Sequence, residues 1–429
     1  MTGLQRFLLL LGIVVLLALP LAVSQSLVNA SIQMLIAVLF ACAFNVLSGQ
    51  GGLLSFGHAA YFGLGAFATV HAMNALGGEG LLPTPLLPLA GAAMGLIAGI
   101  VVGWFATKRS GVYFAMMTLA LAELLHSLAP HLTSYFGGES GLSTTRLPAW
   151  GLSFGTSNQI YYLTLGWVFL SVALLYLFTL TPLGRLTLGV RENANRLRFL
   201  GYNVHRLTVV IFAVSTTFAG LAGALQAINM EGANYVVFDS GVSAAAVLNC
   251  YIGGVTIFLG PALGAAAMTF FGYAVSDLTR SWLLYQGIMF VAVMLFTPTG
   301  IAGLIKLWSA NRKTYGTRAS LPVGGLFVLG ATSIATATIF VVELLQRCFS
   351  QDYRSLAALN GGGWPPIAVF GRAWAPLSPL TWIVPLLLIA LGVLAARVGK
   401  RRWLCVKNAL ALPHAATAST SAQARRNPA

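Results

Sequence analysis

Polar residues interrupt the apolar sequence in the stretch NVLSGQGGLLSFGHAAYFGLGAF, residues 45–67. A Gly- and Ser-rich break at membrane depth exposes backbone amides and carbonyls, which is tolerated only where protein covers them or a water-filled cavity receives them. Such breaks line translocation paths, and here the polar groups would come from Asn45, Ser48, Gln50, Ser55 and His58. The alternative is a plain cytoplasmic hairpin with an interfacial histidine. Residue types alone leave both open.

Glu123 and His126 are an ionisable pair well inside an apolar run, three residues apart on one helical face. At ~1.5 Å per residue, Glu123 lies about 20 Å from Arg109, in the outer part of a ~30 Å hydrocarbon core. Burying such groups is costly, so they are functional candidates. The alternatives are that the two side chains bond only to each other or that His126 lies at the membrane interface. We favour a path-lining role for Glu123 but not for His126. The candidate path residues are Asn45, Gly49, Gln50, Gly52, Ser55, Gly57, His58 and Glu123.

The composition indicates a polytopic membrane protein. Of 429 residues, 58% are hydrophobic and 8% charged, against ~25% charged residues in a soluble globular chain. The net charge of +15 lies in short basic clusters at the ends of apolar runs, as in cytoplasmic loops, and not in a nucleic-acid-binding patch. The four cysteines are single and far apart, so neither a disulfide framework nor a metal site is indicated.

Twelve apolar runs approach the ~20 residues needed to cross a bilayer. They are 7–23, 28–47, 59–76, 86–106, 111–129, 160–180, 207–228, 243–258, 262–277, 283–303, 322–343 and 379–396. We interpret the first as a retained span and not as a signal peptide. The pair at 243–277 is short enough to form one broken or re-entrant element instead.

The distribution of Lys and Arg predicts the topology. With the N-terminus in the cytoplasm and twelve crossings, 19 of the 24 basic residues lie inside. A single crossing at 243–277 would place the basic cluster 306–318 outside, so two crossings are favoured. The sequence thus predicts an all-α polytopic bundle of about 12 membrane segments, with broken or re-entrant glycine-rich elements and both termini cytoplasmic.

Small residues predict close helix packing. Gly91, Gly95, Gly99 and Gly103 recur at four-residue spacing on one helical face, where a neighbouring backbone can approach. We expect this seam to pack within one subunit and not to form a dimerisation face. A second pair, Asn249 and Gly253, has the same four-residue spacing as Asn45 and Gly49.

The cytoplasmic segment 183–201 is predicted to be an amphipathic helix. Its apolar stripe consists of Leu183, Leu186, Val190, Ala194, Leu197 and Gly201, while Arg185, Glu192 and Arg196 lie opposite. By pattern alone, such a helix either docks on a partner or rests in the lipid headgroup layer.

The chain carries no G-x-x-x-x-G-K-[ST], H-E-x-x-H or G-x-S-x-G motif. It is therefore predicted to be a conduit and not an enzyme, with no cofactor. A membrane-embedded transferase would have only Glu123 and His126 as titratable groups. The other alternative, an ion-coupled secondary transporter, would require several intramembrane carboxylates, and only Glu123 is available.

Several motifs resemble the LivM-type permease subunits of branched-chain amino acid ABC transporters. They occur in the family's order over most of residues 30–305: LSGQGGLLSFGHAAYFGLGAF, GVYFAMMTLALAELL, GRLTLGVRENANRLRFLGYNVHRL, FAGLAGAL, IGGVTIFLGPALGAA and YQGIMFVAVMLFTPTGIAGL. The resemblance implies a subunit in the bacterial inner (plasma) membrane. Its partners would be a homologous second permease, two ATP-binding subunits that hydrolyse ATP, and an extracytoplasmic solute-binding protein.

The same resemblance implies that 183–201 is the coupling helix that docks on an ATP-binding subunit, with Arg191, Glu192, Asn193 and Gly201 as the coupling residues. It also implies a solute. We expect hydrophobic, branched-chain amino acids, with urea or short amides as the alternative, because relatives with much the same motifs are associated with both.

Two regions depart from the family. The external loop 136–142 loses a usual Thr and shifts an acidic residue, which puts any inherited role of the loop in doubt. The chain also continues beyond the usual end. We expect a permease domain over 1–305, an extension over 306–407 with two further spans, and a disordered Ala/Ser/Thr-rich tail over 408–429.

Overall fold

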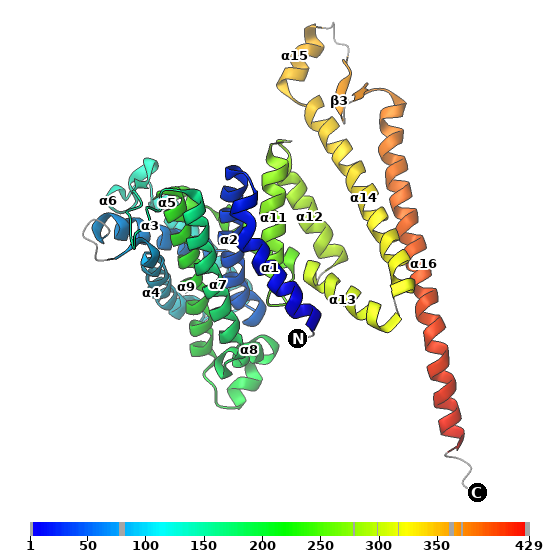
Figure 1. Cartoon of the computed structure of the whole chain (residues 1–429), viewed down its shortest axis with the longest axis horizontal. Helices are drawn as coiled ribbons and strands as arrows, with labels where there is room; N and C mark the ends of the chain where they lie inside the picture. The colour runs from blue at the N-terminus through cyan, green and yellow to red at the C-terminus, as the bar shows by residue number, and fades with distance from the viewer. Residues whose placement is uncertain are drawn as a thin grey trace. The chain divides into compact units, whose positions relative to one another are not determined.

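The computed structural model describes residues 3–76, 82–277, 279–297, 299–315, 317–359, 364–369 and 372–424. The described chain is mainly helical (Figure 1). It divides into two compact units, residues 1–274 with 289–303 and residues 275–288 with 304–429.

Helices make up most of the first unit. They are α1 (Gly3–Ala22), α2 (Gln25–Asn45), the π-helical turn η1 (Val46–Gln50), α3 (His58–Leu76), η2 (Thr84–Leu86), α4 (Pro88–Ala106), α5 (Val112–Leu128), α6 (Thr133–Phe136), η3 (Gly138–Ser140), α7 (Ser157–Leu180), α8 (Pro182–Phe199), α9 (Val204–Met230), η4 (Tyr235–Phe238), α10 (Ser240–Gly253) and α11 (Gly260–Ser276). Strands β1 (Leu142–Ser143) and β2 (Gly232–Ala233) pair antiparallel. Helices α12 (Trp282–Phe296) and α13 (Gly300–Tyr315) follow, and each has residues in both units.

Six helices of the described chain are long and apolar enough to cross a membrane, or up to eight if each of two bent pairs is one span. Each predicted apolar run falls largely on helix, but the count of about 12 is not confirmed. Helices α10 and α11 have only 14 and 17 residues, fewer than the ~20 that a perpendicular span needs. The run at 283–303 is divided between α12 and α13, which are bent by 44°. The cytoplasmic location of the termini stays a prediction.

Helix α9 packs against α4 through the predicted glycine seam. A Cβ on Gly95 would overlap the carbonyl oxygen of Thr216, and one on Gly99 would overlap the Thr216 hydroxyl. Helix α3 approaches the same stretch of α9, because a Cβ on Gly65 would overlap the backbone of Gly220. The seam therefore packs inside the chain, as predicted, and lets three helix backbones meet.

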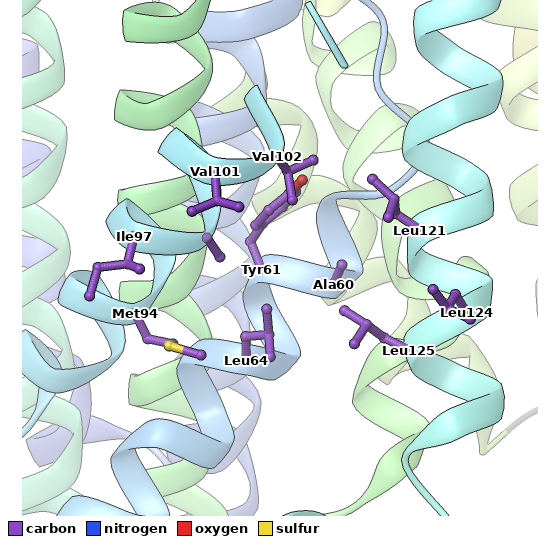
Figure 2. Close-up of a pocket in the computed structure, with 11 residues that line it drawn as sticks. Ala60, Tyr61, Leu64, Met94, Ile97, Val101, Val102, Leu121, Leu124 and Leu125 are labelled. Atoms are coloured by element: carbon purple, nitrogen blue, oxygen red, sulfur yellow. The ribbon is translucent and has the colours of Figure 1, made fainter. Parts of the chain in front are cut away.

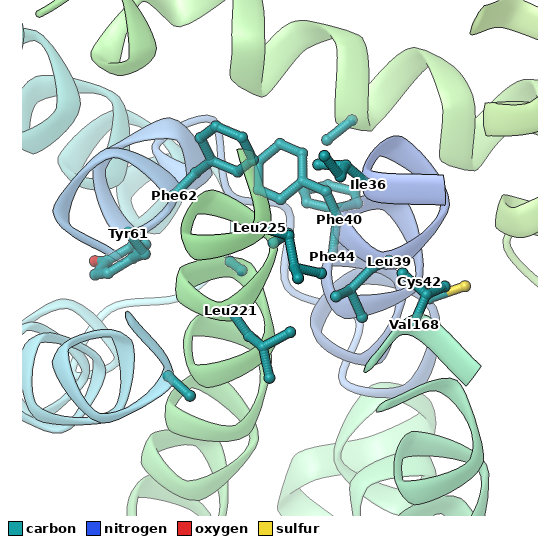
Figure 3. Close-up of a cluster of buried hydrophobic side chains, with 14 of the residues drawn as sticks. Ile36, Leu39, Phe40, Cys42, Phe44, Tyr61, Phe62, Val168, Leu221 and Leu225 are labelled. Atoms are coloured by element: carbon teal, nitrogen blue, oxygen red, sulfur yellow. The ribbon is translucent and has the colours of Figure 1, made fainter. Parts of the chain in front are cut away.

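The apolar core of this unit lies between α2, α3, α7 and α9. Figure 3 shows Phe40 and Phe44 of α2 beside Phe62 of α3 and Leu225 of α9. These side chains are at most 7% exposed. The core fixes the end of α2 relative to the start of α3, which is where the glycine-rich break lies.

Helices α10 and α11 form a tight pair joined by residues 254–259. A Cβ on Gly264 would overlap the carbonyl oxygen of Asn249, and one on Gly253 would overlap that of Gly260. Close backbone contact of this kind stabilises two short helices as one packed element.

In the second unit, α14 (Thr317–Cys348) and α16 (Pro379–Ala424) lie side by side (Figure 1). A Cβ on Gly330 would lie 2.9 Å from the Gly392 carbonyl oxygen, so small residues again set the spacing. Between them are α15 (Gln351–Leu359) and the antiparallel strands β3 (Ile367–Val369) and β4 (Arg372–Trp374).

Helix α16 continues through 408–424, where the composition predicted disorder. Alanine-rich sequence is also compatible with helix, because alanine has the highest helix propensity. The last part of the predicted tail, 425–429, lies outside the described residues.

Candidate functional site

The glycine-rich break begins where α2 passes into the π-helical turn η1. The amide of Gly51 donates to the Val46 carbonyl at 3.2 Å, and that of Gly52 donates to the Ser48 carbonyl at 3.1 Å. Gly52 has a φ of +70°, a left-handed conformation that glycine adopts without steric cost. The glycine therefore ends the helix and turns the chain toward α3.

His58 is fully buried at the other end of the break. Its Nδ1 lies 3.0 Å from Ser55 Oγ and its Nε2 lies 2.8 Å from Ser215 Oγ of α9. Ser215 donates its single hydroxyl proton to the Ala43 carbonyl, so its oxygen accepts from His58 Nε2–H, and Ser55 can donate to Nδ1. This is the arrangement of a neutral imidazole. The burial of His58 and its bond to α9 do not fit a plain cytoplasmic hairpin with an interfacial histidine.

Side chains from other helices satisfy the backbone of the break. Ser243 of α10 accepts from the Ala59 amide at 2.8 Å, and Thr118 of α5 accepts from the Phe56 amide at 3.3 Å. The amide of Gly57 donates to Ser55 Oγ at 3.3 Å. Protein thus covers the break, which is one of the two conditions for irregular backbone at membrane depth.

The glycines of the break are positions of close packing. A Cβ on Gly57 would overlap the carbonyl of Thr118, and one on Gly49 would lie 2.7 Å from the Val255 carbonyl oxygen. Residue 255 belongs to the 254–259 connection, so the break at 45–57 meets the second glycine-rich segment. Asn45 adds a polar contact there, because its Oδ1 accepts from Cys250 Sγ at 3.3 Å.

Arg191 connects α8 to the break. Its Nη1 donates to the carbonyl of Gly49, and a Cβ on Gly52 would lie 2.9 Å from the Arg191 Cγ. The arginine side chain therefore lies along the outer turn of the break. Gln50, next to this bond, has a buried Oε1 with no hydrogen-bond partner among the described residues.

Helix α8 is not the single continuous helix that the sequence predicted. Asn193 has non-helical angles, φ −160° and ψ 94°, and its Oδ1 accepts from the Arg196 amide at 3.0 Å. This is an N-cap, so a second short helix begins after Asn193. The predicted apolar stripe nevertheless packs together, in a cluster that contains Leu183, Leu186, Val190, Ala194, Leu197, Val204 and Leu207.

The remaining coupling candidates lie on the surface. Gly201 has a φ of +85°, and the amide of Tyr202 donates to the Leu197 carbonyl at 3.0 Å. This closes the helix in the manner of a Schellman motif and explains a glycine there. Glu192 is exposed, and its carboxylate has no hydrogen bond or ion pair within the described part of the chain.

Glu123 is not brought into the packed break. It is exposed on α5, and no hydrogen bond or ion pair joins its carboxylate to another described residue. Its neighbours Leu121 and Leu124 instead line an apolar cavity of about 290 Å³ with Tyr61 of α3 and Val101 of α4, as Figure 2 shows. Three residues further on, the His126 ring lies 5.6 Å from that of Tyr235.

Sequence reasoning missed the hydroxyls of Thr118, Ser215 and Ser243, which hold the break in place. Each is a hydroxyl in a mainly apolar helix, and no spacing signal distinguishes it from other hydroxyls. Another missed contact is the ion pair between Arg146 and Glu231, which fixes the segment after β1 to the end of α9.

Comparison with known proteins gives a consistent result. Residues 26–298 match the family model described as "Branched-chain amino acid transport system / permease component". The high-affinity branched-chain amino acid permease protein LivM of Escherichia coli is 27% identical over 69% of this chain and 75% of its own length. The Salmonella typhimurium LivM is 27% identical over 72% and 78%, and the Pseudomonas aeruginosa permease protein BraD is 24% identical over 65% and 95%. No solved structure matches the chain.

Proposed function

Because the chain belongs to the family of permease components of branched-chain amino acid transport systems, we propose that it forms the membrane path of an ABC importer for hydrophobic, branched-chain amino acids. It is a multi-pass membrane permease component and not an enzyme. We place it in the inner (plasma) membrane, with a homologous second permease, two ATP-binding subunits and an extracytoplasmic solute-binding protein. Residues 1–305 are the permease domain in this proposal, and 306–407 are an extension.

One contact supports this mechanism above the others, the bond from Arg191 to the Gly49 carbonyl. It joins the cytoplasmic helix α8, which we propose docks on an ATP-binding subunit, to the break at the inner end of α2. A guanidinium on a carbonyl is a charge-assisted bond with fixed direction. Movement of α8 driven by ATP would therefore act directly on the backbone of the break.

The break is proposed to be the gate of the path. Asn45, Ser55 and His58 are buried and bonded within the protein, which corresponds to a closed gate. Rearrangement of α8 would release Gly49 and expose these polar groups to the solute, together with Gln50. Glu123 remains a candidate for the path because it is the carboxylate on the exposed face of α5.

Copurification tests the proposal. The tagged chain, isolated with its native partners in mild detergent, is expected to carry a P-loop subunit whose ATP hydrolysis rises when solute-loaded binding protein is added. Transport by the purified chain alone, driven by an ion gradient, would instead identify a secondary transporter. The two results exclude one another, so the measurement decides the class.

A further inference from the structure

A second cavity lies beside the break, between α2, α3, α9, α10 and the segment 234–237. It has a volume of about 310 Å³, near the lower end of the ~300–1,000 Å³ of small-molecule sites. Much of its wall is apolar and includes Phe40, Phe62 and Val242. Figure 3 shows the first two of these side by side with Ile36, which also lines it.

Four amide side chains also line this cavity, and three of them, one each from α2, α9 and α10, carry a buried atom without a partner among the described residues. Gln33 Nε2, Gln226 Oε1 and Asn249 Oδ1 are buried and have no hydrogen-bond partner among the described residues. Asn249 is only 6% exposed. Leaving buried polar atoms unpaired is costly, and most such atoms in proteins are paired. Three unpaired amides meeting at one cavity therefore indicate a ligand that supplies the missing bonds.

The chemistry of the wall restricts that ligand. None of the described residues that line the cavity is ionisable, so a ligand with net charge would lack a compensating partner. The two unpaired oxygens, Gln226 Oε1 and Asn249 Oδ1, can accept hydrogen bonds, and Gln33 Nε2 can donate one. A matching ligand therefore has a donor group at one end of its polar part and an acceptor group at the other. The aromatic and aliphatic wall suits a ligand whose remaining part is apolar.

We propose that this cavity is a transit site for a hydrophobic α-amino acid, an inference that rests on the proposed function. The ammonium group donates to Gln226 Oε1 and Asn249 Oδ1, and the carboxylate accepts from Gln33 Nε2. The apolar side chain packs on Phe40 and Phe62. Recognition therefore uses neutral amides and no ion pair, and the net charge of the bound zwitterion is zero.

The cavity is positioned to communicate with the break. Asn249 precedes Cys250, whose thiol donates to Asn45 Oδ1, and the Phe40 ring lies 6.4 Å from that of His58. A solute held by Asn249 therefore contacts α10, and α10 contacts the proposed gate through Cys250. Its next step toward the cytoplasm is past Asn45.

Equilibrium binding of tritiated leucine to the reconstituted complex in lipid nanodiscs, without ATP or binding protein, tests the site. Asn249→Leu and Gln226→Met keep side-chain size and remove an acceptor. Each is expected to weaken leucine binding by about tenfold to a hundredfold, the usual effect of losing a hydrogen bond to a charged group. Asn158→Leu is the matched control, because Asn158 Oδ1 is likewise buried without a partner in the described chain but lies outside this cavity.

A second measurement uses only the unmodified complex, so it stands even if the variants fail to fold. Unlabelled isoleucine is expected to displace leucine, while lysine and glutamate at a hundredfold excess are not. Wild-type leucine binding by both folded variants, or displacement by lysine, overturns the inference. If both variants bind leucine like the wild type, ATP-driven leucine uptake by the same preparations would leave the proposed function intact. Binding of urea and not of leucine would overturn both.

Discussion

At the scale of single residues, Gly57 shows how closely the break is packed. Its α-carbon faces the carbonyl of Thr118, so even a methyl group would overlap the backbone of α5. The position is thus restricted by packing in this conformation, whatever solute passes nearby. A bulky residue at 57 would disturb the fold before it could obstruct a path.

Gly57→Ala is expected to destabilise the protein by about 1–3 kcal/mol, the usual cost of overpacking. Gly166→Ala is the control, because a Cβ there meets nothing within 4 Å and alanine favours helix. Thermal melting in detergent, followed by size-exclusion chromatography, measures the difference. The packing argument would be contradicted if both variants melted like the wild type.

The polar residues of the break could be predicted from the sequence, but their partners could not. The run from Asn45 to His58 stands out because glycine, serine and histidine interrupt apolar sequence. The hydroxyl of Ser215 looks no different from that of Thr216, yet Thr216 bonds the Phe212 carbonyl of its own helix while Ser215 contacts His58. Hydroxyls in helices commonly bond their own backbone, so only tertiary packing identifies the exceptions.

At the scale of elements, α8 shows what periodicity predicts and what it misses. The spacing of apolar residues predicted the packed stripe, because the same side chains pack together on either side of the kink. It missed the kink itself. Asn193 favours an N-cap, but an asparagine inside a periodic stretch is also tolerated on the solvent face of a helix.

The two charged residues of α8 are expected to act differently. Arg191→Gln removes the charge-assisted bond to Gly49 but leaves the other exposed residues of α8 in place. ATP-binding subunits should then copurify at wild-type levels, while uptake and the stimulation of ATP hydrolysis by loaded binding protein are lost.

Glu192→Lys, by contrast, changes an exposed carboxylate that has no partner among the described residues. It is expected to reduce copurification of the ATP-binding subunit. Glu192→Gln serves as the milder control. Loss of copurification in Arg191→Gln but not in Glu192→Lys would reverse the assigned roles.

At the scale of the whole molecule, composition and charge predicted a polytopic helical membrane protein, and the helices of the described chain agree with this, while the count of about 12 spans stays a prediction. Apolarity alone does not distinguish a short packed helix, such as α10 or α11, from a full crossing. Close backbone contact at Gly253 and Gly264 packs these two helices together.

Cysteine labelling tests the topology. Cys348 and Cys405, the free cysteines that are not fully buried, are first replaced by serine. Glu139→Cys and Ser355→Cys are then expected to react from outside with a membrane-impermeant thiol reagent, and Asn195→Cys and Arg312→Cys are not. Reaction of residue 312 from outside would mean that 240–276 crosses the membrane once.

The central claim is that this chain carries hydrophobic amino acids through a membrane under the control of ATP. Uptake of tritiated leucine into proteoliposomes that contain the complete complex measures this directly, with loaded binding protein outside and ATP inside. We predict accumulation that requires ATP and is lost in Arg191→Gln. Accumulation of urea but not leucine, or leucine uptake that proceeds equally without ATP, would contradict the account.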